Sequence, residues 1–186
     1  MKKHLVASAA VLAMAIPFAA TAEINYSFVE LDYILQDDDD DTDGFRLKGS
    51  YGITDDIFAF GSYTTFDLDQ GDFDLLSIGV GYRFGLNEQA DLYAGASIER
   101  LDIGDDDAVG FGLQLGARYQ VIPALELRGE LAYIDIDDDP VELDQTLVTV
   151  GAQYFVTPAI GLIAEYTVDT DSDGDDGIIL GGRFNF

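Results

Sequence analysis

Ten stretches of this chain alternate between large apolar residues and small or polar residues at every second position. They run over residues 24–36, 44–53, 57–66, 74–86, 91–101, 109–121, 125–134, 145–156, 160–168 and 177–186. A period of two predicts β-strands, because successive side chains of a strand point to opposite faces. After residue 22 no stretch sustains the 3.6-residue period of a helix. The sequence therefore predicts an all-β chain.

The connections between these stretches are of two kinds, which alternate along the chain. Four are short, at 54–56, 87–90, 122–124 and 157–159. Five are longer and acidic, at 37–43, 67–74, 102–108, 135–144 and 169–176; they hold 25 of the 36 acidic residues and no Lys or Arg. Hairpins laid side by side place alternate connections at opposite rims. The pattern predicts a closed antiparallel up-and-down β-barrel of ten strands, or of eight if two stretches are misassigned.

The chemistry of the two phases predicts which one faces outward. Leu113 and Leu115 are typical of the apolar phase, whereas Gly112, Gln114 and Arg118 represent the other. The water-facing phase of a soluble barrel would carry many Lys and Glu residues. Here it is mostly glycine and serine, which suit a narrow lumen. We therefore expect the apolar phase to face lipid, in a transmembrane barrel; a soluble secreted protein of lipocalin type is the alternative.

Nearly all cations of the strands fall in the polar phase, together with several carboxylates. Unpaired, each would cost several kcal/mol when removed from water, so we expect Arg–carboxylate pairs to fill the lumen. The predicted network comprises Glu30, Asp32, Arg46, Lys48, Arg83, Glu99, Arg118, Arg128, Glu130, Glu165 and Arg183. Arg100, near a strand end, is ambiguous. Tyr26 and Phe28 leave the apolar phase of the first strand, which either a bulge or inward-facing aromatics would explain.

The first 22 residues have the features of a cleaved signal peptide. A basic head precedes an apolar run over 5–20, and "ATA" at 20–22 predicts cleavage before Glu23. The domain would then span 23–186. The whole chain has a net charge of −27, which makes nucleic acid an unsuitable partner. There is no Cys, and the single His4 leaves with the signal peptide, so we expect neither catalysis nor a resident cofactor.

Two acidic connections spell D-x-D-x-D-G, a spacing found in calcium loops. They place Asp39, Asp41 and Asp43, and likewise Asp169, Asp171 and Asp173, at alternate positions before a glycine. Neither has a glutamate at the twelfth position, which is Ser50 in one and Leu180 in the other. The stretches are either calcium or magnesium sites or generic solvated acid.

The chain resembles the small outer-membrane β-barrel proteins of Gram-negative bacteria, the OmpA/OmpX-like group, and is most similar to a ten-stranded subset. The resemblance rests on "YSFVELDY" (26–33), "GFRLKGSYGI" (44–53), "GVGYRF" (79–84) and the ending "GGRFNF" (181–186), in that order. It implies a cell outer membrane location, contacts with membrane lipids and lipopolysaccharide, and a monomer. The terminal Phe186 is then the signal for the barrel assembly machinery.

Three functions remain open from the sequence. The first is a structural surface barrel with acidic extracellular loops and a lumen plugged by Arg–carboxylate pairs. The second is a small pore for ions or solutes, as in the porin family. The third is a calcium-dependent surface adhesin.

Overall fold

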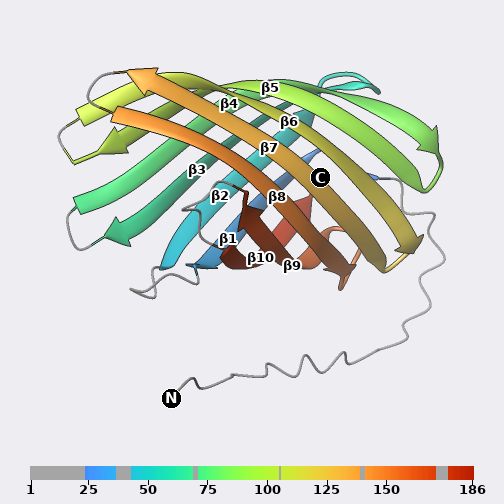
Figure 1. Cartoon of the computed structure of the whole chain (residues 1–186). Coiled ribbons are helices and arrows are strands. Elements are labelled where there is room, and N and C mark those ends of the chain that lie inside the picture. Colours follow the sequence, from blue (N-terminus) through green and yellow to red (C-terminus); the bar gives the residue numbers. More distant parts are fainter. Residues whose placement is uncertain (1–23, 37–42, 69–70, 105, 139–140, 171–175) are drawn as a thin grey trace, which may run out of the picture.

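A computed structural model describes residues 24–36, 43–68, 71–104, 106–138, 141–170 and 176–186. These residues form one closed antiparallel sheet, in which each strand pairs with its neighbours in sequence and the first strand pairs with the last (Figure 1). The strands are β1 (Phe28–Gln36), β2 (Asp43–Gly52), β3 (Ile57–Leu68), β4 (Gly71–Asn87), β5 (Ala90–Ile103), β6 (Asp106–Ile122), β7 (Leu125–Asp138), β8 (Val141–Phe155), β9 (Ile160–Asp169) and β10 (Asp176–Asn185). The predicted ten-stranded barrel is confirmed, and the eight-stranded alternative is wrong.

No helix in the described part of the chain is long and apolar enough to span a membrane.

The apolar phase of the strands points outward. Ile98 is 67% exposed and Ile78 is 63% exposed, whereas Arg118 and Glu30 in the opposite phase are 5% and 1% exposed. Among the described residues 37 large hydrophobic side chains are exposed, most of them in this outward phase, far more than a soluble protein leaves on its surface. The soluble lipocalin-type alternative, which needs these side chains inside, is therefore wrong.

The two ends of the barrel differ in their connections. The turn end carries the four short connections, residues 24–27 and the carboxyl-terminal Phe186, whose backbone N–H donates to the carbonyl of Ser27 at 3.0 Å. The opposite end carries the acidic connections, and we call it the acidic end. The central strands reach furthest toward it: β4 and β6 have 17 residues each, against 9 in β1 and 10 in β10.

Three of the five acidic stretches, 67–74, 102–108 and 135–144, are mostly strand, which corrects the long loops predicted there. Residues 71–74, 102–103, 106–108, 135–138 and 141–144 all belong to strands. Their acidic side chains alternate with apolar ones that turn inward. Leu101, Ala108 and Ile136 form a buried cluster inside the barrel, against which Phe73 and Leu143 pack. The apolar half of the alternation thus extends the sheet beyond the predicted boundaries.

The first strand begins later than the alternation predicts. Residues 24–27 are not strand; they enter the lumen at the turn end, where Ile24 and Tyr26 are buried. Phe28 lies in the same inward phase as Glu30. Of the two explanations for the irregular first stretch, inward-facing aromatics are therefore correct.

Several predictions fall outside the described residues. These are the signal peptide over 1–22 and four of the six candidate metal ligands, Asp39, Asp41, Asp171 and Asp173.

Candidate functional site

An aromatic cluster fills the lumen near the turn end. Tyr26 lies against Phe58, with ring centroids 4.7 Å apart, and Tyr93 meets Tyr26 edge-on at 6.3 Å. Phe60 packs on the same cluster. Inward-facing glycines make the room: a Cβ at Gly81 would collide with the ring of Phe58, and one at Gly116 with that of Tyr93. Small residues in the polar phase thus accommodate aromatic rings from neighbouring strands.

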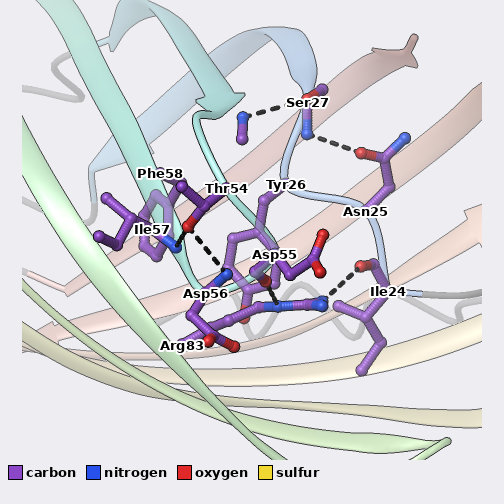
Figure 2. Close-up of a pocket in the computed structure, with 11 residues that line it drawn as sticks. Ile24, Asn25, Tyr26, Ser27, Thr54, Asp55, Asp56, Ile57, Phe58 and Arg83 are labelled. Carbon is purple, nitrogen blue, oxygen red and sulfur yellow. Dashed lines mark hydrogen bonds between the residues drawn. The ribbon is translucent and has the colours of Figure 1, made fainter.

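The segment 24–27 is held in place by side chains of β4 and β6 and by a backbone N–H of β2. Figure 2 shows Arg83 lying beside it and donating to the carbonyls of Ile24, at 3.5 Å, and of Asp55. Arg118 donates to the carbonyl of Asn25 at 2.8 Å. The hydroxyl of Ser27 accepts from the backbone N–H of Gly52 at 3.1 Å (Figure 2). These bonds satisfy backbone groups that have no strand partner.

Next to this segment, toward the acidic end, an ion pair joins Arg118 and Glu126. The Arg118 guanidinium donates to both carboxylate oxygens, at 2.8 and 3.0 Å, and both residues are buried. The guanidinium also lies 4.8 Å from the ring centroid of Tyr26. A bidentate, stacked arginine of this kind has a fixed geometry and cannot be replaced by lysine without loss.

Further toward the acidic end, two carboxylate–arginine groups cross the lumen. Glu30 accepts from Arg183 Nε at 2.6 Å and lies 3.5 Å from Arg128 Nη1. Arg46 Nη2 lies 2.8 Å from Asp32 and 3.4 Å from Glu165. Arg128 Nη2 lies 2.9 Å from Glu165, so the two groups join. The strands thus bring together six of the predicted members, while Arg118 has a separate partner in Glu126.

Other predicted members have different partners among the described residues. Glu99 accepts from the hydroxyls of Ser77 and Ser97 rather than from an arginine. Glu130 accepts from the hydroxyl of Tyr93. Arg83 lies 3.5 Å from Asp91, beside the segment 24–27. Of these three residues, Arg83 has a carboxylate partner, whereas Glu99 and Glu130 accept hydrogen bonds from hydroxyl groups.

The two remaining cations of the strands, Lys48 and Arg100, lie on opposite faces of the sheet. Lys48 lines the middle of the lumen and has no carboxylate within 4 Å in the described part of the chain. Arg100, ambiguous in the sequence, points outward, where its Nη2 lies 3.0 Å from Asp102 and 3.5 Å from Asp107. The other cations of the strands face inward.

Sequence reasoning missed three residues of the lumen. Glu126 and Asp91 are buried partners of Arg118 and Arg83. Each has the same parity as a known inward residue of its strand, Arg128 in β7 and Tyr93 in β5, and this parity was a sufficient signal. Tyr93 itself was missed because an aromatic residue in the polar phase has no charge to mark it.

Three cavities follow one another along the lumen. The first, about 330 Å³, lies at the turn end beside Asp55, Asp56 and Arg83 (Figure 2). The central cavity, about 40 Å³, shares Tyr26 and Phe58 with the first. The third, about 610 Å³, begins at Arg46 and Glu130 and extends toward the acidic end; we call it the cup. The lumen is thus narrowest between two wider spaces.

The predicted metal ligands that are described lie apart. Asp43 is exposed and accepts from the hydroxyl of Tyr33 at 2.5 Å, whereas Asp169 is buried and lines the cup. No group of three or more acidic, His or Cys side chains able to hold a metal ion occurs among the described residues. The calcium or magnesium sites stay a prediction.

Comparison with known proteins decides the family. The family model of the outer membrane protein beta-barrel domain matches residues 5–155. This chain belongs to the outer-membrane β-barrel family. The membership confirms the resemblance to small outer-membrane barrels and implies an outer membrane location in a Gram-negative bacterium. No curated protein matches the chain.

Solved structures share the fold of this outer-membrane barrel at low sequence identity. The NanC porin, in a rhombohedral crystal form, aligns with a TM-score of 0.60 at 12% identity, covering 85% of this chain and 100% of that one. The KdgM porin aligns with a TM-score of 0.54 at 13% identity, covering 86% and 99%. A second KdgM structure, in complex with disordered oligogalacturonate, gives 0.53 at 14% identity, covering 86% and 99%. At these identities the likeness concerns the fold alone.

Proposed function

We propose that this protein is a structural outer-membrane barrel whose lumen is closed to solutes and which presents an acidic rim at the cell surface. The observation that carries the proposal is the central cavity of about 40 Å³. A water molecule occupies about 30 Å³ of liquid volume, so a sugar or amino acid does not fit there. The Tyr26–Phe58 pair and Arg118, which Glu126 holds in place, bound this narrow point.

The two ends have the features that fix orientation in this family. Outer-membrane barrels have short periplasmic turns and longer extracellular connections. The turn end therefore belongs in the periplasm and the acidic end at the cell surface, above the lipopolysaccharide. Exposed acidic residues of β5 to β8 would then stand outside the hydrocarbon core, where water can solvate them.

Single-channel recording in planar bilayers tests the closed lumen. We expect the wild-type protein to show no stable unitary conductance. The double variant Tyr26→Ala/Phe58→Ala removes two rings from the narrow point and should produce one. The matched control is Tyr82→Ala/Phe84→Ala, which removes an outward-facing pair with centroids 4.6 Å apart on β4 and should leave the bilayer silent. A stable wild-type conductance would overturn the proposal.

The second candidate function is a small pore for ions. Wider cavities at both ends of the lumen and the structural likeness to proteins named porins favour it. A pore of this width would pass water and small ions only. The oligogalacturonate bound in the KdgM complex is a polyanion, and an acidic rim would repel such a substrate.

A calcium-dependent adhesin rests on the acidic stretches alone. It predicts calcium binding that is lost, together with surface attachment, when Asp169, Asp171 and Asp173 become Asn. Lipopolysaccharide and the assembly machinery are the partners that we propose for the outer surface and for Phe186.

A further inference from the structure

The cup is a ligand-sized cavity lined by both apolar and polar side chains. Its volume of about 610 Å³ lies within the range of small-molecule sites, 300–1,000 Å³. Nine of its twenty lining residues are apolar: Ile34, Phe66, Phe73, Leu75, Ala132, Ile134, Leu143, Leu147 and Ile179. Covering these side chains with the apolar body of a ligand releases water from them, which is favourable. Because the other lining residues are mostly polar, the cup suits a molecule that combines an apolar body with a charged group.

Charge in the cup favours a cation. Arg46 is the only basic residue that lines it among the described residues, and Asp32 and Glu165 already neutralise that guanidinium, at 2.8 and 3.4 Å. Glu130 at the floor and Asp169 near the mouth are the acidic side chains that turn inward. The outward acids of the surrounding rim add to the same negative potential, which raises the local concentration of cations.

Aromatic faces strengthen the same preference. Phe66 and Phe73 line one wall, with ring centroids 5.9 Å apart in an edge-to-face arrangement. Aromatic faces attract ammonium ions, and quaternary ammonium groups are bound in this way in aromatic sites. The aliphatic side chains, the carboxylates and the aromatic rings of the cup thus favour the same kind of ligand.

We propose that the cup binds small hydrophobic cations, whose apolar body its apolar side chains contact and whose charge its inward carboxylates, Glu130 and Asp169, and its two phenylalanine rings attract. The floor is closed by the Arg46 group, so the site is a dead end reached from the acidic end. This proposal goes beyond the closed-lumen function and does not depend on whether the central cavity conducts ions.

Methyl NMR of the full-length protein in lipid nanodiscs tests the site. The probe is benzyltrimethylammonium, compared with uncharged benzyl alcohol and anionic benzenesulfonate. Ile34, Ile134 and Ile179 report on the cup, whereas outward-facing Ile78, Ile98 and Ile178 report on the lipid. We expect the cation to shift the cup methyls saturably, with an affinity about tenfold above that of benzyl alcohol, because one favourable charge contact contributes about a factor of ten.

Two glycines of β10 offer a matched pair of variants. Gly177 lines the cup, and a Cβ there meets only Leu35 O at 3.4 Å and Ile34 Cγ2 at 4.0 Å, so Gly177→Phe fills the cavity without a backbone clash. Gly182 faces outward with nothing within 4 Å. Gly177→Phe should abolish the saturable shifts, and Gly182→Phe should leave them unchanged. Asp169→Asn should weaken binding about 3- to 10-fold.

Each other outcome overturns the proposal. Equal shifts of Ile178 and Ile179 mean that the probe partitions into lipid. Equal affinity for benzenesulfonate removes the charge argument. No shift of any methyl means that the cup is filled in the intact protein. Heat-modifiable gel migration confirms that each variant is folded before it is scored.

Discussion

At the scale of single residues, the lumen depends on shared carboxylates. Glu30 is 1% exposed and lies within 4 Å of three arginines, of which Arg183 and Arg128 are themselves buried. Desolvation of these charges is compensated only while the geometry is complete. Removing one member leaves its partners as uncompensated buried charges.

Glu30→Gln should therefore be strongly destabilising. The amide has the same shape but no charge, so Arg183 and Arg128 lose their common partner. We expect the free energy of unfolding to fall by about 3–5 kcal/mol, measured by urea titration with far-UV circular dichroism in lipid vesicles. Circular dichroism suits a chain without Trp.

Arg100→Gln is the matched exterior control. Arg100 and Asp102 are 52% and 42% exposed, and pairs of this kind contribute about 0–1 kcal/mol. Equal effects of the two substitutions would contradict the importance that we assign to burial.

The sequence predicted which face of the sheet each charged side chain occupies, but not the residue with which it pairs. Alternation correctly predicted that Arg118 and Arg183 face inward. It did not predict that Arg118 pairs with Glu126, because this contact depends on the β6–β7 register, in which Arg118 lies opposite Arg128 and a shift follows Gln120. Register is set by long-range packing and by turn geometry, which no local pattern encodes.

At the scale of elements, the outer parts of the central hairpins bring like charges face to face. Asp102 lies opposite Asp107 in β5–β6, and in β7–β8 Asp135 lies opposite Asp144 and Asp137 opposite Glu142. Directly opposed like charges destabilise a strand pair by about 0.2–1 kcal/mol each. Arg100 lies beside the first pair, whereas no basic side chain accompanies the other two among the described residues.

Hydrogen exchange should therefore depend on salt at the acidic end of β7–β8. Between about 0.01 M and about 1 M salt the Debye length falls from about 30 to about 3 Å. We expect the protection of amides in 135–144 to rise about 2- to 30-fold, and that of 102–107 to rise less. In the Arg100→Gln variant, amide protection in β5–β6 should depend on salt as strongly as that in β7–β8.

Amides of 125–131, in the part of β7 nearer the turn end, provide the internal control, and their protection should not depend on salt. The acidic residues led to a prediction of loops for these stretches, although apolar residues alternate with the acidic ones as in a strand. Phe73, Ile136 and Leu143 were the signal for strand.

At the scale of the whole molecule, the barrel must be recognised by the assembly machinery and inserted into the membrane, and it must also be stable there. Phe186 is 58% exposed and touches little: its ring lies 6.4 Å from that of Phe184, and its backbone N–H bonds to Ser27. Such a side chain contributes little to the folded barrel, which fits a role in assembly.

Phe186→Ala should lower the amount of folded barrel in the outer membrane several-fold in cells. Its free energy of unfolding in vesicles should fall no further than that of Phe184→Ala, because both rings point outward and lose similar contact with lipid. Phe184→Ala, which removes an outward ring one position from the strand end, is therefore the comparison. A matching loss of folded barrel in cells for both variants, or a larger loss of stability for Phe186→Ala, would argue against an assembly signal.

Divalent ions should matter at the acidic end of the intact protein. The folded barrel should migrate faster than the boiled one in detergent gels, and chelation with EDTA should speed protease cleavage near the acidic end without unfolding the barrel. Unchanged cleavage rates on chelation would count against both the calcium sites and ionic bridging to lipopolysaccharide.

The uneven strand lengths have a mechanical consequence at the seam where the chain's two terminal strands meet. β1 and β10 are aligned over nine residue pairs, whereas β4 and β5 are aligned over fourteen. Unlike the other short junctions, this one has no covalent hairpin to hold it. Under force or heat, β1 and β10 should therefore separate first, and the long central strands β4 to β8 should separate last.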